Sequence, residues 1–450
     1  MNSPTAYAPA VAAPAGAPVE PEPAHVEARW SLATRVLFRF AFAYFGLYVL
    51  PFPIDLLHWP GSDYVIPPVR WYMEAGHKVV PWFGKHVLHL ASDITVFPNG
   101  SGDTTYNWVS TLMGLIAAAA IALIWTALDR KRLQYTRLHG WFQILVRMWL
   151  GSVLVSYGAF KLFPSQFPPP YLARYFERYG DSSPMGILWT LMGASQGYSF
   201  FSGAVETLAG VLLFVPATAL LGALIGAAAM LNVFALNMGF DVPVKLYSFH
   251  LMMAGIMIAA PDLPRLCNFL MRGRAIEPRA DAPLVSRRWA RRTLLGAQLV
   301  IGAYLLALLL FSSHRQSRMI AEFGRKTPNY GAWAVDEFML DGVARPPLTT
   351  DPERWQNFIV QGPTGAVIVP MNGTLDRCQA KLDEAHNAIE ITSSQPKWSA
   401  KLTYRREGDK LTFEGTRDGK PVKIALHRID PQWLLKTRGF HWVNEFPFNR

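Results

Sequence analysis

Long runs of hydrophobic residues dominate the first 312 positions of the chain. Residues 113–128 contain no charged side chain, and similar windows recur along the sequence. About 20 helical residues cross the ~30 Å hydrocarbon core of a bilayer. We therefore predict seven transmembrane helices, at residues 32–54, 108–128, 141–163, 200–215, 219–238, 247–260 and 293–312.

One further apolar stretch, residues 185–198, is interrupted by polar and small residues, namely Gly193, Ser195, Gln196 and Gly197. We interpret it as a re-entrant or interfacial helix. Counting it as a span would invert the orientation of everything that follows.

After residue 312 the pattern changes to short alternating segments separated by turn residues such as Asp418-Gly419. These segments lie at residues 358–361, 366–371, 375–382, 388–392, 400–405, 410–416 and 421–428. Seven or eight short strands joined by hairpins predict a small antiparallel β-barrel. We expect the aromatic end of the chain, residues 438–448, to fold back onto the barrel or the membrane surface.

The predicted fold is thus an all-α polytopic membrane bundle followed by a small antiparallel β-barrel domain outside the membrane. The expected divisions are a disordered Ala/Pro-rich cytoplasmic tail (1–28), two N-terminal spans with an outer loop (29–140), a four-helix core (141–272), a basic cytoplasmic loop with the seventh helix (273–312) and a periplasmic barrel domain (313–450).

Composition and charge support a membrane protein and give its orientation. Of the 450 residues, 51% are hydrophobic and only 17% are charged, whereas soluble proteins carry about 25% charged residues. Basic residues gather in the loops at 129–140 and 262–292. Because short cytoplasmic loops carry the excess of Lys and Arg, we expect the N-terminus inside and the barrel in the periplasm of a bacterial inner membrane. The net charge of +11 then reflects orientation and contact with the lipid bilayer rather than nucleic acid.

Polar residues inside the spans are costly, so each one is a candidate for function. They gather in the outer half of the predicted membrane: Tyr157, Lys161, Glu206, Asn232, Asn237, Asp241, Lys245 and His250. We expect a charge-balanced pocket in which Lys161 pairs with Glu206 or Asp241 and His250 exchanges protons. The alternative is that these groups only hold the helices together by hydrogen bonds.

The segment before the second span carries Ser101 and Asp103 between glycines. Asp103 or Thr104 is a suitable N-cap for that span, and the glycines permit backbone N–H groups to converge on an anion. This segment is either a cap alone or a cap that also contributes to the pocket.

Two short motifs in the outer domain resemble known barrels. Gly331-Ala332-Trp333 on the first strand and Arg428 on the last resemble the pairing that closes one end of lipocalin-like barrels. This resemblance implies a ligand cup, but a barrel of this size can also be filled by its own side chains.

The core resembles the DoxX family of bacterial membrane proteins, in a long form. The matching stretches are Tyr157-Gly158 with Lys161-Leu162-Phe163-Pro164, Ser183-Pro184-Met185, and Asp241-Val242-Pro243-Val244-Lys245 leading to His250. DoxX proteins are four-helix membrane proteins named after a subunit of a thiosulfate:quinone oxidoreductase. The resemblance implies a quinone-associated redox subunit.

Two functions compete on this evidence. In the first, a quinol binds in the outer leaflet, Glu206 and His250 relay its protons and Lys161 stabilises the quinolate. A redox partner is then required, because two cysteines, Cys267 and Cys378, cannot build an iron–sulfur cluster, and one histidine within the spans excludes bis-histidine haem. No metal site is expected. In the second, a non-catalytic module holds a lipid or small acid and recruits a periplasmic partner. A transporter is less favoured, since no inverted repeat is evident.

Overall fold

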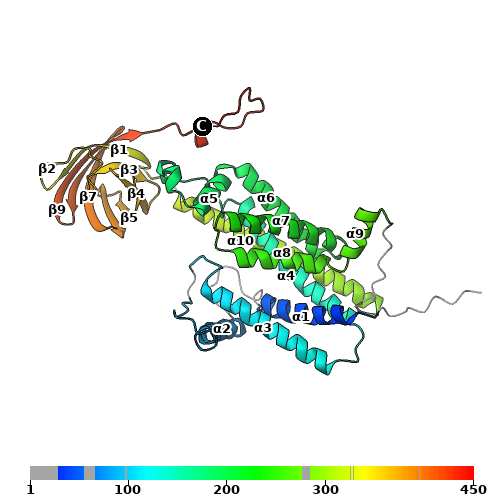
Figure 1. Ribbon diagram of the computed structural model, residues 1–450. Helices are drawn as coiled ribbons and strands as arrows, with labels where there is room; N and C mark the ends of the chain where they lie inside the picture. Colours follow the sequence, from blue (N-terminus) through cyan, green and yellow to red (C-terminus); the bar gives the residue numbers. More distant parts are fainter. Residues whose placement is uncertain are drawn as a thin grey trace, which may run out of the picture.

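The computed structural model describes residues 29–54, 66–96, 99–275, 284–324, 326–327, 329–394 and 396–449. It consists of an elongated helical bundle with a β-barrel at one end (Figure 1). This arrangement confirms the predicted combination of a helical membrane bundle and a small antiparallel barrel. The predicted tail at residues 1–28 lies outside the described residues.

Six helices in the described part of the chain are long and apolar enough to cross a membrane. They are α1 (Leu32–Val49), α3 (Thr105–Leu128), α4 (Thr136–Leu162), α6 (Gln196–Phe214), α7 (Ala219–Gly239) and α10 (Arg288–Phe323). A seventh span results if the bent pair α8 (Lys245–Ala259) and α9 (Leu263–Arg272), which turn by 78°, counts as one. The 36 residues of α10 extend over about 54 Å, well beyond the hydrocarbon core.

Two further helices lie between the spans. The helix α2 (Pro67–His86) occupies part of a stretch predicted only as an outer loop, and it packs beside α3. The helix α5 (Pro184–Ala194) has 11 residues, about 16 Å, and is too short to cross a bilayer. A break at Ser195 separates α5 from α6, and the last three residues of the predicted stretch belong to α6. The interpretation of this stretch as re-entrant or interfacial stays a prediction.

Two reciprocal glycine contacts bring α4 and α6 unusually close together. A Cβ atom on Gly203 would lie 2.6 Å from the carbonyl oxygen of Gly158, and one on Gly158 would lie 2.6 Å from that of Gly203. Two turns further along α6, a Cβ atom on Gly210 would lie 2.6 Å from the carbonyl oxygen of Gly151. Small residues permit such backbone contact between membrane helices. The two helices are therefore held at a distance that no larger side chain allows.

The barrel contains eight antiparallel strands closed by pairing of the first with the last. The closed ring runs through β1 (Gly331–Leu340), β3 (Trp355–Val360), β4 (Gly365–Pro370), β5 (Asp376–Asp383), β6 (Ala388–Ser394), β7 (Lys397–Glu407), β8 (Lys410–Arg417) and β9 (Lys420–Ile429), while β2 (Val343–Ala344) pairs only with β1. All seven predicted strand segments coincide with strands of this sheet.

Side chains fill the inside of the barrel. Trp333, Trp355, Phe358 and Phe413 are at most 2% exposed and pack against one another. The cavity beside Phe358 and Phe413 measures only about 10 Å³, and a single water molecule needs at least this much room. Of the two interpretations of the barrel, the filled one fits the structure and the ligand cup does not.

The structure brings the residues of the lipocalin-like motif together at one end of the barrel. Trp333 and Arg428 are opposite each other in the β1–β9 register, as the motif requires. The guanidinium that lies over the Trp333 indole, 5.4 Å from the ring centroid, is however that of Arg406 on β7. The predicted pairing of Trp333 with Arg428 is therefore present, and Arg406 adds a second cation, over the ring.

The outside of the barrel docks onto the segment between α4 and α5. Ala332, Ile359 and Val367 pack against Ala173 in the 3₁₀ helix Leu172–Phe176. The amide of Ala173 donates a hydrogen bond to Gln361 Oε1 over 3.3 Å. The barrel therefore rests on the membrane bundle through an apolar contact, in addition to the covalent connection through α10.

The aromatic end of the chain does not fold back onto the barrel. Phe440, Trp442 and Phe446 are 76%, 91% and 82% exposed. The expectation that this segment packs on the barrel is therefore wrong. Its contact with the membrane surface stays a prediction.

Candidate functional site

A buried ion pair forms the centre of the candidate site. Lys161 Nζ donates to Glu206 Oε2 over 2.6 Å, and the two side chains are 7% and 1% exposed. Each residue follows a glycine of the α4–α6 contact by three positions, Gly158 for Lys161 and Gly203 for Glu206. Residues three apart share one helix face. The close approach of the backbones therefore brings the two charges together.

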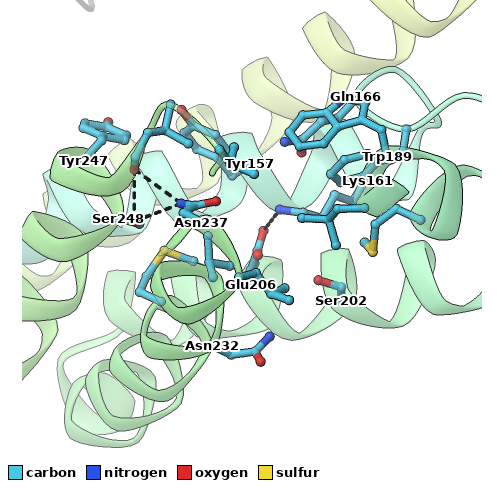
Figure 2. A pocket seen from close by; sticks show the side chains of 18 of the residues that line it. Tyr157, Lys161, Gln166, Trp189, Ser202, Glu206, Asn232, Asn237, Tyr247 and Ser248 are labelled. Carbon is cyan, nitrogen blue, oxygen red and sulfur yellow. Dashed lines mark hydrogen bonds and ion pairs between the residues drawn. The ribbon is translucent and has the colours of Figure 1, made fainter. Parts of the chain in front are cut away.

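The second oxygen of the Glu206 carboxylate has no partner. Glu206 Oε1 is buried and makes no hydrogen bond, and the same holds for Gln166 Oε1. A buried acceptor without a donor costs about 1–3 kcal/mol. Both residues line one pocket (Figure 2), so two unsatisfied acceptors lie in the layer of side chains that surrounds it.

This ion-pair pocket has a volume of about 90 Å³. Its lining is mostly apolar and includes Trp189 and Met192 of α5, and it contains a few polar groups, including Ser202 of α6 (Figure 2). Apolar walls with few polar groups are typical of small-molecule sites. The volume is nevertheless below the 150 Å³ cavity that admits benzene in a model protein, so the pocket accommodates a polar head group or waters rather than a whole ring.

Three other predicted residues contribute to this pocket. The Tyr157 ring lies 5.8 Å from Lys161 Nζ, within cation–π distance. Asn232 is exposed at the edge of the pocket. Asn237 is 4% exposed and donates to Ser248 Oγ over 3.0 Å and to the carbonyl of Val244 over 3.3 Å. The amide of Asn237 therefore fixes the turn between α7 and α8.

Asp241 and Lys245 lie outside the pocket. The Asp241 side chain is 84% exposed and pairs with Lys245 Nζ at 2.8 Å. Asp241 has a φ of 50°, because the chain reverses direction there after α7. Of the two acids proposed as the partner of Lys161, the structure selects Glu206.

Ser101 and Asp103 have a structural role away from the pocket. The Asp103 carboxylate accepts from the backbone amides of Lys245 and Leu246 over 2.8 and 2.9 Å, at the first turn of α8. Ser101 Oγ accepts from the amide of Asp103 over 3.2 Å. The sequence offered Asp103 or Thr104 as the N-cap of α3, and the structure shows that it is Thr104. Asp103 instead accepts hydrogen bonds from the otherwise unpaired first amides of α8.

His250 belongs to a second cavity on the other side of Tyr157 and Tyr247. His250 Nε2 is 2.6 Å from Tyr44 Oη, and its ring stacks on Tyr48 with centroids 4.2 Å apart. The expectation of one pocket that contains both Glu206 and His250 is wrong. The reason is that α8 turns His250 towards α1, a helix outside the predicted four-helix core.

This tyrosine cavity measures about 560 Å³, within the usual range for ligand sites. It lies between α1, α2, α3, α4 and α8, and the aromatic side chains in its wall are Tyr44, Tyr48, Tyr72, Tyr157, Tyr247 and His250. Tyr157 and Tyr247 also line the ion-pair pocket, and their ring centroids are 6.0 Å apart. The two cavities therefore share a wall of two phenols.

Sequence reasoning did not find Gln166, Tyr44 or Tyr48. Gln166 lies in an irregular segment after α4, where no periodic pattern points to a cavity. Tyr44 and Tyr48 are four residues apart on one face of α1, a spacing that indicated a shared surface. Nothing in the sequence linked that surface to α8.

The structure describes no group of three or more His, Cys, Asp or Glu side chains that could hold a metal ion. Both cysteines are free: Cys267 is exposed on α9 and Cys378 is buried in the barrel. Burial and the nearby Asp376 carboxylate raise the pKa of the Cys378 thiol to about 12.

Comparison with known proteins gives little further information. No family model and no solved structure matches the chain. Over 76 residues, 17% of this chain, the sequence is 40% identical to the Bacillus subtilis (strain 168) protein called uncharacterized protein YwoB. The match covers 49% of that protein, so the chain spans about half the length of this curated relative, whose name states no activity.

Proposed function

We propose that the chain is an integral inner-membrane protein of the DoxX type that acts as a quinone-linked redox subunit. The observation that carries the proposal is the tyrosine cavity of about 560 Å³ beside a buried carboxylate with one unpaired oxygen. The cavity has room for a lipophilic ring, which the ion-pair pocket lacks.

The two cavities suit different parts of this chemistry. In the tyrosine cavity, Tyr48 and His250 offer a stacking surface and Tyr44 a hydroxyl group. In the ion-pair pocket, Glu206 Oε1 has no donor and can accept a proton, while Lys161 Nζ holds the other carboxylate oxygen at 2.6 Å. A bound quinol supplies two electrons and two protons. His250 in the tyrosine cavity takes one proton, and the other passes the phenols of Tyr157 and Tyr247, which stand between the cavity and Glu206.

The electrons must pass to a partner protein outside the membrane, and the barrel is the proposed docking domain. Its filled interior suits a recruiting surface better than a ligand cup. We place the barrel in the periplasm and the N-terminus in the cytoplasm. The amino end of α1 and the helix α9 lie at the end of the bundle opposite the barrel (Figure 1), and the basic loops gather at that end.

One observation favours the second candidate function, a non-catalytic membrane module that holds a lipid or small acid. Segment 166–192 lines the ion-pair pocket and also carries the barrel contact at Ala173. Such a connection suits a protein that reports pocket occupancy to a partner and performs no electron transfer.

Quinone content distinguishes the two candidates. The full chain is purified in native lipid particles, and quinone is quantified by mass spectrometry in wild type and in Gly114→Leu, which fills the tyrosine cavity. Gly46→Leu is the matched control, because a Cβ on Gly46 meets nothing within 4 Å. We expect near-stoichiometric quinone in wild type and control and a loss of at least tenfold in Gly114→Leu.

A second measurement tests the proton-accepting role. The reduction potential of the retained quinone is followed against pH in wild type and Glu206→Gln, and we expect its pH dependence to change in the variant. Bulk phospholipid without quinone in the wild type would refute the redox proposal and favour the non-catalytic module.

A further inference from the structure

A basic cleft lies where the barrel meets the segments that connect it to the bundle. We call it the junction cleft; it measures about 390 Å³. Its wall combines the α10–β1 connection with Lys326, the end of β9 with Arg428 and Asp430, and the short helix α11 (Leu434–Thr437) with Lys436. It is separate from both membrane cavities and shares no lining residue with them.

The cations of the junction cleft are not neutralised. None of Lys326, Arg428 and Lys436 forms an ion pair with any described residue, and Lys326 Nζ only faces the Tyr330 ring at 5.5 Å. Against these three charges stands one acid, Asp430. The cleft therefore keeps an excess of two positive charges, which favours an anion with more than one negative charge.

The shape of the cleft is fixed by two local features. Gly331 has a φ of 146°, which disfavours any side chain there, and its Cβ position lies 3.7 Å from Arg428 Nε, so the backbone and the guanidinium are neighbours in the cleft wall. On the opposite side, the Trp433 ring stacks on Tyr175 with centroids 5.1 Å apart. Trp433 and Leu172 give the cleft one apolar wall.

We propose that the junction cleft binds a phosphate ester. A guanidinium matches two phosphate oxygens at once, and ammonium groups add point charge. The apolar wall suits the ester's organic part. The phosphate has two sources, the head group of an anionic lipid in the adjacent leaflet and a free phosphate monoester.

The test uses the full chain in detergent. Calorimetric titration with glycerol 3-phosphate examines the free ester, and native mass spectrometry with added phosphatidylglycerol examines the lipid. The variant is Arg428→Gln/Lys436→Gln. The charge-matched control is Lys397→Gln/Lys420→Gln, whose residues are exposed at the other end of the barrel. Lys326→Gln is a milder second variant.

We expect affinity to fall about fivefold for each cation removed, since a basic residue near an anionic surface contributes about 1 kcal/mol and tenfold corresponds to 1.4 kcal/mol. The double variant should thus lose about 25-fold, and the control should bind like wild type. A loss in one arm alone supports the proposal and identifies the source. Wild type that binds neither probe, or variant and control that bind alike in both arms, overturns it.

Discussion

Removal of Lys161 tests whether the buried ion pair is a structural clamp or a site retained for function. Lys161→Met leaves the Glu206 carboxylate, 1% exposed, with no donor on either oxygen, because Oε1 already lacks one. An uncompensated buried charge costs about 3–5 kcal/mol. Glu206→Leu leaves the ammonium equally unpaired, so we expect a similar loss.

The double variant Lys161→Met/Glu206→Leu removes both charges together. Apolar replacement of a buried pair is often neutral or stabilising by about 1–4 kcal/mol. We therefore expect the double variant to be at least as stable as wild type, although each single variant is not. Stability that returns when both charges are absent means that folding does not require the pair.

The assay is the free energy of unfolding, from SDS titration of the protein in mixed micelles followed by tryptophan fluorescence. Lys85→Met is the control, because Lys85 and its partner Asp93 are 65% and 84% exposed. An exposed pair contributes at most about 1 kcal/mol. The reasoning is wrong if each single variant loses less than about 1 kcal/mol, the value typical of polar contacts between membrane helices.

Four further predictions concern helix packing, the barrel core and the start of α8. Gly203→Val should lower the free energy of unfolding by about 1–3 kcal/mol, because its Cβ would lie 2.6 Å from the Gly158 carbonyl oxygen; SDS titration measures this. The barrel should lose stability as pH rises from about 9 towards 12: the unfolded thiol of Cys378 ionises near 9.0, whereas the folded one stays protonated until about 12. At pH 8 iodoacetamide should therefore label Cys267 and spare Cys378, as peptide mass spectrometry would report. Asp103→Ala should cost about 0.5–2 kcal/mol, since it frees two amides at the start of α8.

Each of these predictions has an outcome that contradicts it. Unchanged stability in Gly203→Val would mean that α4 and α6 are not in backbone contact. Equal labelling of both cysteines at pH 8 would contradict a closed barrel core. If the stability of the wild type changes between pH 9 and 12 no more than that of Cys378→Ala, the raised pKa of the Cys378 thiol is contradicted. If Asp103→Ala and the neighbouring Ser101→Ala lose the same small amount, the carboxylate is no cap.

The sequence predicted the spans and strands well because hydrophobic periodicity is a local property. Each span has to match a bilayer thickness, and each strand has to alternate, wherever the element lies in the fold. The bend of 78° after α8 and the helix α2 escaped prediction. The helices α2 and α9 are amphipathic, and a window average of hydropathy does not distinguish an amphipathic helix from a polar loop.

The candidate site was predictable only in part. Lys161 and Glu206 were identified as costly charges, but the choice between Glu206 and Asp241 depended on which helices touch. The glycines at 158 and 203, each three residues before a charge, would have decided it. His250 faces α1 through Tyr44, a contact between segments 206 residues apart for which one sequence offers no signal.

The segment between α4 and α6 connects the aqueous and membrane parts of the molecule mechanically. Arg174 in the 3₁₀ helix donates to Thr190 of α5 over 2.6 Å, while its neighbour Ala173 is clamped to the barrel. A force applied to the barrel is therefore transmitted to the wall of the ion-pair pocket that contains Trp189 and Met192. A second path runs through α10, which continues into the barrel and packs against α4 and α6, so tension on the barrel reaches the pocket from two sides.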